Sequence, residues 1–339
     1  MERKAFGKLA DGEEATLYTI SNTKGMYAQI TDFGASIVSL VVKDKDGKNT
    51  DVVLGYENAE TYQQQMASFG AVVGRNCNRI ANAEIVIDGV TYQLEKNDNE
   101  NNLHRGSQAT SRRLWDAEEQ TADKITFVIK DAEGQQGYPG NAVMKVTYEV
   151  TEANELSITY HATADKTTIF NMTNHAYFNL CGKGKKITEH RLHIPADRIL
   201  DTTPAFIPTG KRMNVKNTPF DFTSLKPIGT DLYADHEQLL WNKGYNHCYI
   251  LKDEISVEML EAASLYEPVT GRNMTVMTDL PAVLLYTAGY YERPDTAVCL
   301  ETQFYPDTPS HSDFPSCLVL PEKAYEHCTL FHFQVQKEE

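Results

Sequence analysis

The feature that most constrains the fold is an alternation of apolar and polar residues, with a period of two, that recurs between turn signals. Residues 84–94 show this alternation on both sides of Asp88-Gly89, the dipeptide that favours a two-residue hairpin turn. The segment therefore predicts a β-hairpin. The same alternation predicts strands in four further segments, of which the first is followed by another Asp-Gly pair: 35–42, 143–150, 156–160 and 282–287.

Helical patterns are few and short, and the clearest are 58–66 and 231–241. Many short strands with frequent turns, and no regular alternation of strand and helix, predict an all-β fold, a large antiparallel β-sandwich with few short helices. Because no repeat, low-complexity tract or linker divides the chain, we expect a single domain over residues 1–339. Two loops, 97–108 and 201–226, are long enough to carry function.

Charge and cysteine content exclude several classes of partner. A net charge of -15 argues against nucleic acid or an anionic membrane as the main partner, because both favour basic surfaces. The six cysteines are scattered, which favours reduced thiols over a disulfide framework. The first residues lack the apolar core of an export signal and no long apolar run follows. We expect a cytoplasmic protein, monomeric or homodimeric, although a trimmed export signal stays open.

A histidine within an otherwise uncharged, strand-like run is the first candidate for chemistry. In residues 170–180 one face is apolar apart from Asn174, and the other face carries only hydrogen-bonding groups: Asn171, Thr173, His175, Tyr177 and Asn179. A solvent-facing surface would be expected to carry Lys, Glu or Asp, so this face indicates a polar, neutral ligand. Taken alone, His175 is explained equally well as a hydrogen-bonded, half-buried histidine.

A lone carboxylate in a second strand is the other candidate. Glu301 is the only formal charge in residues 297–305, and a buried carboxylate is costly unless it has solvent, a partner or a chemical role. By itself a solvent-exposed glutamate is the simpler interpretation. Together with His175, however, Glu301 would form a general base and a general acid across a polar concavity. We therefore favour function for the pair, whose adjacency is inferred.

Two loops add groups that suit a hydroxyl-rich ligand. Residues 74–80 and 97–105 are rich in asparagine and arginine, which supply donors, acceptors and a rigid donor fork. Each loop alone would be ordinary surface chemistry. No metal is expected, since His190 and His193 would point to opposite faces of a strand. Nucleotide cofactors and serine acyl transfer are not expected either, because their glycine-rich and Gly-x-Ser-x-Gly motifs are missing.

Several motifs connect the chain to a known family. They stand in the family's order nearly from end to end: Gly74-Arg-x-x-Asn-Arg-Ile80, Asn102-Leu-His104, Gly137-Tyr-Pro-Gly-Asn141, Thr173-Asn-His-x-Tyr-Phe-Asn-Leu180, Ile207-Pro-Thr-Gly210, Thr218-Pro-Phe-Asp-Phe222, and Leu300-Glu-Thr-Gln-x-x-Pro-Asp307 with Phe314-Pro-Ser316. Through them the chain resembles aldose 1-epimerase, also called galactose mutarotase. The resemblance implies a β-sandwich isomerase that needs no cofactor and interconverts the α and β anomers of free aldoses such as galactose or glucose.

The resemblance also implies roles for individual residues. Glu301 matches the family's catalytic base and His175 its acid. The residues that would contact the sugar or line its pocket are Asn78, Arg79, His104, Tyr177, Asn179 and Asn246.

Three segments depart from the family's usual motifs. Asn246 stands where an aspartate is usual, Arg105 replaces a glycine after Leu103-His104, and Leu284 replaces a glutamine. Charge-assisted hydrogen bonds are roughly twice as strong as neutral ones, so an amide in place of a carboxylate should bind sugar hydroxyls more weakly. We therefore expect a retained reaction with a weakened or altered hexose preference, towards a different epimer or a pentose.

Two other functions remain open at this stage. One is a hexose-6-phosphate 1-epimerase, for which Arg105, Arg112 and Arg113 would supply the positive charge that a phosphate needs. The other is a sugar-binding protein that has lost catalysis. The intact pair of Glu301 and His175 argues against the second alternative, because a pure binder needs neither an acid nor a base.

Overall fold

A computed structural model describes residues 2–65 and 67–336. Its largest sheet contains nine strands, in spatial order β11 (Asp116–Gln120), β12 (Lys124–Asp131), β13 (Ala142–Val150), β14 (Glu155–Ala164), β27 (Tyr325–Val335), β23 (Arg272–Thr278), β22 (Leu260–Tyr266), β17 (Arg191–His193) and β20 (Lys226–Pro227). Neighbouring strands pair antiparallel throughout this sheet.

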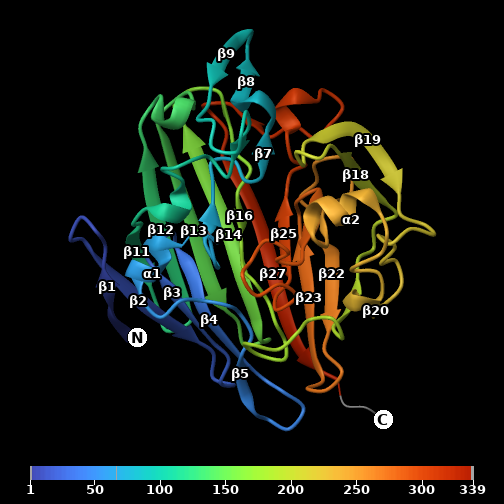
Figure 1. The fold of residues 1–339 in the computed structure, drawn as a ribbon. Helices are drawn as coiled ribbons and strands as arrows, with labels where there is room; N and C mark the ends of the chain where they lie inside the picture. The colour runs from blue at the N-terminus through green and yellow to red at the C-terminus, as the bar shows by residue number, and fades with distance from the viewer. Residues whose placement is uncertain (1, 66, 337–339) are drawn as a thin grey trace.

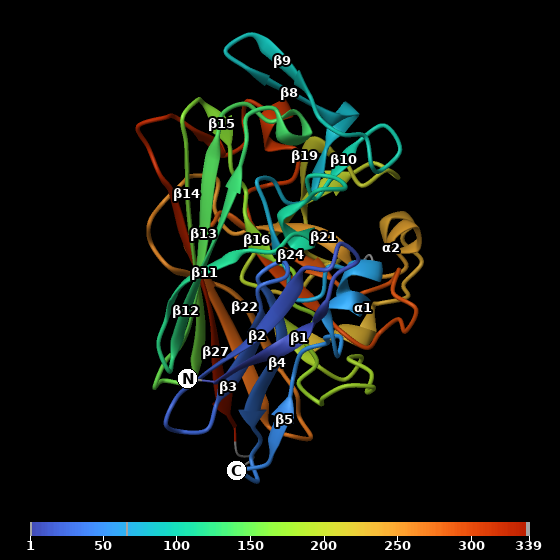
Figure 2. The same ribbon diagram turned by 90° about the vertical axis from the view of Figure 1, so that its left-hand side faces the viewer.

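Two five-stranded sheets pack on one side of the nine-stranded sheet (Figure 2). The first contains β1 (Glu2–Lys8), β2 (Glu14–Ser21), β3 (Tyr27–Thr31), β4 (Ser36–Lys43) and β5 (Asn49–Asp51). The second contains β19 (Pro208–Asn214), β18 (Arg198–Thr202), β21 (Asn246–Ile250), β24 (Ala282–Tyr286) and β25 (Cys299–Gln303). The predicted all-β sandwich is confirmed.

Short strand pairs, two α-helices and five 3₁₀ helices of three residues each complete the elements of the described residues. The pairs are β7 (Arg79–Ile80) with β10 (Asn102–Leu103), β6 (Val72–Val73) with β16 (Thr173–Asn174), β15 (Thr168–Ile169) with β26 (Leu318–Val319), and β8 (Glu84–Ile87) with β9 (Val90–Gln93). The α-helices are α1 (Ala59–Gln64) and α2 (Glu237–Asn242). Neither helix, and no other within the described ranges, is long and apolar enough to cross a membrane.

The alternating segments form the strands that their pattern predicts. The hairpin β8–β9 turns at Asp88 and Gly89, whose φ angles of 51° and 77° are both left-handed, as the tight turn requires. The other four segments are β4, β13, β14 and β24. In β13 every second side chain is buried, because one face of the sheet packs on the core.

The helix predictions are confirmed only in part. Helix α1 begins after Asn58, whose side chain accepts a hydrogen bond from the Thr61 amide, as an N-cap does. It ends at Gln64, and Met66, the last residue of the predicted helix, lies outside the described residues. The second predicted helix is wrong over residues 231–236, which form turns. His236 caps α2 by accepting from the Gln238 amide. The apolar spacing before this cap therefore reflects packing of a turn and not helical periodicity.

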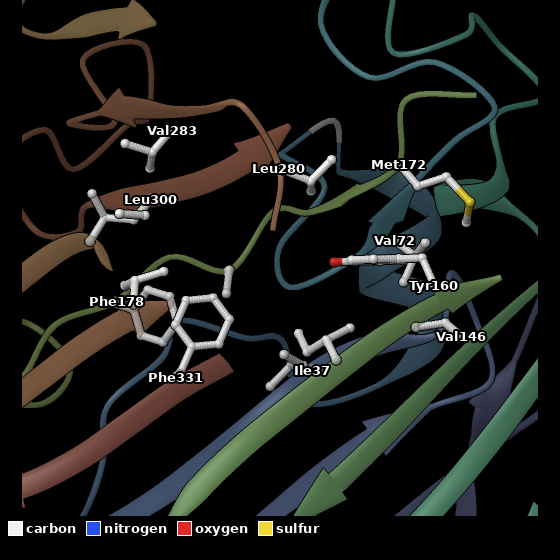
Figure 3. Close-up of a cluster of buried hydrophobic side chains, with 14 of the residues drawn as sticks. Ile37, Val72, Val146, Tyr160, Met172, Phe178, Leu280, Val283, Leu300 and Phe331 are labelled. Carbon is white, nitrogen blue, oxygen red and sulfur yellow. The ribbon is translucent and has the colours of Figure 1, made fainter. Parts of the chain in front are cut away.

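The core lies between the sheets and draws on all three (Figure 3). Ile37 comes from β4, Val146 from β13, and Val283 and Leu300 from β24 and β25. Full burial of such a side chain contributes roughly 1.5–3 kcal/mol, and this shared burial holds the layers together. The single domain stays a prediction, which a common core favours. All six cysteines are free thiols.

The run 170–180 is not one continuous strand. Only Thr173–Asn174 pairs as a strand, with β6, and Phe178 forms single bridges to Val53 and Val298. The alternation of faces nevertheless holds, because the apolar side chains of the run are buried in the core. Asn174, on the core face, donates its amide to the Gly70 carbonyl. His175 lies on the other face and directly follows β16, the strand that lies beside β25 (Figure 1).

Candidate active site

A pocket of about 460 Å³ opens where the segments that carry the predicted site residues meet. Its lining residues come from the segments on either side of α1, from β7 and β10 and the residues beside them, and from the segment after β16. Others come from β21, β24 and β25 and from the loop that follows β24. The lining residues are Tyr56, Gln65, Ala67, Ser68, Asn78, Arg79, Leu103, His104, His175, Tyr177, Asn246, Leu284, Tyr286, Tyr290, Tyr291, Glu292 and Glu301. The volume lies within the range of small-molecule sites.

The two predicted titratable groups meet in this pocket. Atom Nε2 of His175 lies 3.7 Å from Oε1 of Glu301, and the two side chains are only 8% and 1% exposed. Glu301 faces the pocket because it alternates with Leu300 and Thr302 along β25, and these two pack on the other side. The structure thus brings together an acid–base pair from segments 126 residues apart, the difference between 301 and 175.

Burial controls the protonation of this pair. Neither carboxylate oxygen of Glu301 has a hydrogen-bond partner among the residues described, and Leu284 lies directly opposite on β24. Desolvation therefore raises the pKa of Glu301 to about 8. Desolvation likewise lowers the pKa of His175 to about 4. At neutral pH the empty pocket consequently holds one proton on the pair, and burial favours its place on Glu301.

His104 is held as a neutral hydrogen-bond donor. The Asn78 amide donates to His104 Nδ1 at 3.2 Å, and the His104 amide donates to the Asn78 carbonyl at 3.1 Å. Because Nδ1 accepts a hydrogen bond, the ring proton must lie on Nε2. Burial, with His175 nearby, keeps the pKa of His104 well below its usual value. The two imidazole rings are 5.4 Å apart.

Arg79 is oriented by two contacts outside the pocket. Its Nε donates to Oδ2 of Asp98 at 2.7 Å. Its guanidinium also lies over the ring of Phe206, 4.7 Å from the centroid, at a distance suited to a cation–π contact. Held from both sides, the guanidinium presents its remaining N–H groups in a fixed direction.

Aromatic side chains form one wall of the pocket and restrain His175. The Tyr177 ring stacks on the imidazole with centroids 4.9 Å apart and planes 12° apart. Tyr286 meets the same imidazole edge-on at 6.2 Å. Phe69 packs behind Tyr177 at 4.6 Å. These contacts fix the plane of His175 and limit the water that can reach it.

Five of the six predicted sugar-contacting or pocket-lining residues line the pocket, and Asn179 does not. The five are Asn78, Arg79, His104, Tyr177 and Asn246. Asn179 is buried, and its side-chain amide donates to the carbonyls of Lys185 and Thr296 at 2.7 and 2.8 Å. Its predicted place in the pocket is therefore corrected, because the Asn179 amide holds backbone carbonyls of two other segments and so serves the fold. The sugar contacts themselves stay predictions.

Several lining residues have no signal in the sequence. Tyr286 is an exception, because it shares a strand face with Leu284 and alternation alone would have placed it in the pocket. The others lie in irregular segments, where no periodicity predicts which side chain turns inward. They include Tyr56, Gln65, Ser68, Tyr290 and Tyr291.

The arginines that would suit a phosphate lie elsewhere. Arg105 and Arg113 pair with the buried Asp131 at 2.7 and 2.6 Å, and Arg112 donates to the carbonyls of Gln63 and Gln65. None of the three is among the lining residues. The basis of the hexose-6-phosphate alternative is therefore missing from the described pocket.

Three side chains at the site have donor atoms close enough together to hold a metal ion. Within the described ranges His175, Cys299 and Glu301 place donor atoms within 4.8 Å of one another, a combination that zinc accepts. Metal ligands must be deprotonated, however, and burial raises the pKa of Cys299 well above its usual value. Cys299 is also absent from the residues that line the pocket. His190 and His193 have separate partners, the Leu180 amide and Glu261.

Comparisons with known proteins point in one direction. Residues 16–332 match the family model described as aldose 1-epimerase. An aldose 1-epimerase of Escherichia coli (strain K12) is 34% identical over 335 residues, 95% of this chain and 96% of its own. A galactose mutarotase of Rattus norvegicus is 35% identical over 345 residues, 98% of each chain.

Solved structures agree with these sequence matches. A GalM/aldose epimerase homologue from C. elegans superposes with a TM-score of 0.87 at 28% identity, over 95% of this chain and 99% of its own. A galactose 1-epimerase from Lactobacillus acidophilus NCFM gives a TM-score of 0.86 at 25% identity, over 99% of each chain.

Proposed function

This chain belongs to the aldose 1-epimerase family, and we propose that it is an isomerase that interconverts the α and β anomers of free aldoses. The observation that carries the proposal is the pair of Glu301 and His175, 3.7 Å apart and almost completely buried. Carboxylate oxygens without a partner are costly to bury, and a sugar hydroxyl would satisfy them. The substrate is thus a monosaccharide.

The pair can open and close a pyranose ring by proton transfer. Glu301 takes the proton of the anomeric hydroxyl while His175 gives a proton to the ring oxygen, and the C1–ring oxygen bond breaks to leave the aldehyde. Rotation about the C1–C2 bond presents the other face of C1. Ring closure then reverses both transfers, so that the two groups exchange roles. Each transfer contributes roughly 10²–10⁴-fold.

The reactive arrangement has the proton on His175. In the empty pocket burial favours the proton on Glu301, so a proton must move between atoms 3.7 Å apart. A bound anomeric hydroxyl donates a hydrogen bond to the carboxylate, and hydrogen bonding to the charged form lowers a carboxyl pKa. Substrate binding thereby favours the reactive arrangement.

A bell-shaped pH profile is expected from this shared proton. Below about pH 4 both His175 and Glu301 are protonated, so no base remains. Above about pH 8 both are deprotonated and no acid remains. We expect kcat/KM to fall on both sides of this window. Initial mutarotation rates by polarimetry, corrected for the buffer-catalysed reaction, measure the profile, and a rate that stays constant from pH 6 to pH 10 would contradict it.

Other groups around the pair should not add limbs to this profile. Burial favours the neutral form of each of them, because it raises the pKa of a thiol or phenol and lowers that of an imidazole. These groups are Cys299, Tyr177, Tyr286 and His104.

Three residues are proposed to orient the sugar. His104 donates from Nε2, Arg79 from its free N–H groups, and Asn78 lines the same side of the pocket. Groups fixed in place before the substrate arrives position the ring and stabilise developing charge at little further cost.

Asn246 is proposed to weaken or alter the hexose preference. Its side-chain amide lines the pocket and offers neutral hydrogen bonds where a carboxylate would offer stronger ones. We expect Asn246→Asp to raise kcat/KM for the preferred hexose by roughly fivefold, and Asn246→Ala to lower it. Freshly dissolved α-anomers of galactose, glucose, arabinose and xylose are the panel. A preference that does not change in either variant would refute this role.

Polarimetry with the same panel tests the proposed function itself. The wild-type protein should speed the approach to anomeric equilibrium for at least one free aldose. A protein that binds these sugars without speeding the approach would instead be the non-catalytic sugar-binding protein. The cytoplasmic location, and the monomeric or homodimeric state, stay predictions.

A further inference from the structure

The loop that carries His104 contains an unusual backbone bend. His104, Arg105 and Gly106 have φ angles of 51°, 74° and 100°, so three consecutive residues are left-handed. Glycine adopts such angles freely, whereas a residue with a Cβ does so at a cost in free energy. A backbone hydrogen bond from the Gly106 amide to the Leu103 carbonyl, 3.1 Å long, closes the bend, and a side-chain contact of Arg105 can offset the cost that remains.

A buried ion pair supplies this side-chain contact. The Arg105 guanidinium is fully buried, and its Nη2 lies 2.7 Å from Oδ2 of Asp131, whose side chain is fully buried too. The guanidinium also lies near the Tyr138 ring. If the Arg105 backbone moved, its buried guanidinium would lose this carboxylate and its charge would be left uncompensated, although Asp131 would keep Arg75 and Arg113. The ion pair therefore resists any movement of the Arg105 backbone.

The same carboxylate holds the second loop of the pocket. Arg75 Nε lies 3.2 Å from Oδ2 of Asp131, and Arg75 belongs to the segment that continues to Asn78 and Arg79. Asp131 ends β12, a strand of the nine-stranded sheet. One buried carboxylate thus ties both proposed sugar-contacting loops to the same rigid sheet.

We infer that Arg105 is a positioning residue, whose ion pair with Asp131 holds the left-handed bend that turns the His104 ring into the pocket. With the ring of His104 in this place, the Asn78 amide donates a hydrogen bond to its Nδ1. The Nε2–H group is then left to face the substrate. A change of φ at Arg105 would move His104 and break this contact. The inference rests on the proposed function, in which His104 binds the sugar.

Two substitutions at Arg105 separate the ion pair from the backbone strain. Arg105→Met keeps the bulk, removes the ion pair and leaves an unfavourable φ. Arg105→Gly also removes the ion pair but tolerates the bend. We expect Arg105→Met to raise KM for the preferred aldose roughly tenfold, through a lost or misplaced hydrogen bond, and Arg105→Gly to raise it less. The smaller effect of glycine would identify the bend as the element that the ion pair holds.

Arg113→Gln is the matched control. Arg113 pairs with the other oxygen of Asp131 at 2.6 Å but does not belong to the His104 loop. Its loss should lower the melting temperature about as much as the Arg105 substitutions and leave KM within twofold of wild type. The imidazole ¹⁵N signals of His104 give a second readout: the accepting Nδ1 signature should persist in Arg113→Gln and weaken in both Arg105 variants.

The outcomes discriminate clearly. The inference is overturned if both Arg105 variants keep the wild-type KM and the wild-type His104 signals, even if their melting temperatures fall. If only one of the two variants folds, the same result in that variant overturns it. An equal rise of KM in Arg113→Gln would reduce Arg105 to a general structural role and overturn it as well. If the wild-type protein speeds no mutarotation, the proposed function fails, while the His104 signals still decide whether Arg105 holds the loop.

Discussion

Glu301→Gln is expected to slow mutarotation by roughly 10²–10⁴-fold without unfolding the protein. The amide has the shape of the carboxyl group but cannot take the proton of the anomeric hydroxyl. Polarimetry on a fresh α-anomer measures the loss. A variant that keeps more than a tenth of the wild-type rate would remove Glu301 from the role of base.

The same substitution should stabilise the protein at higher pH. Burial raises the folded-state pKa of Glu301 from 4.5 to about 8. The free energy of unfolding of the wild type is therefore highest below the unfolded-state pKa of Glu301, and it decreases as pH rises through the folded-state pKa. Glutamine does not titrate, so the melting temperature of the variant should equal that of wild type near pH 4 and exceed it at pH 8. Lost activity with a raised melting temperature excludes misfolding as the explanation.

His175→Asn should cause a loss of similar size, roughly 10²–10⁴-fold. Asparagine can still form a hydrogen bond to the ring oxygen but cannot deliver a proton to it. The residual rate should rise with pH through about 8, as Glu301 ionises and becomes available as the remaining base. Initial rates by polarimetry between pH 5 and pH 9 measure both the loss and the altered profile.

His193→Asn is the matched control for this prediction, because His193 lies outside the pocket and faces Glu261. It should leave the rate unchanged. The double variant of Glu301 and His175 should lose far less than the product of the two single losses, because both residues act on one shared proton. If the loss of rate in the double variant instead equals the product of the two single losses, the two groups act independently.

Local patterns predicted much of the fold. The hairpin at Asp88-Gly89 and the strands β4, β13, β14 and β24 follow from alternation and turn chemistry, which act between near neighbours in the chain. The predictions failed where distant contacts override local pattern. Residues 231–236 have helical spacing but form turns before the His236 cap. The run around His175 is held by short bridges to separate segments instead of one long pairing.

The sequence by itself determined which groups can do the chemistry. Glu301 and His175 stand out because each is the only acid or imidazole in an otherwise uncharged strand-like run, and such isolation is visible without any structure. Family motifs then connected the two groups to one reaction. Asn179 shows the limit of this reasoning: it alternates correctly, but its amide bonds to backbone carbonyls instead of facing the pocket.

Tertiary structure alone decided how those groups are placed and charged. The 3.7 Å separation of Glu301 and His175, their opposite pKa shifts and the Arg105–Asp131 ion pair all join segments that are far apart in the chain. Their approach depends on the order of strands in the sheets and on the exclusion of water, and neither is encoded by near neighbours. Burial is a property of the packed sheets, so the pKa values of Glu301 and His175 shift only once the sheets have packed.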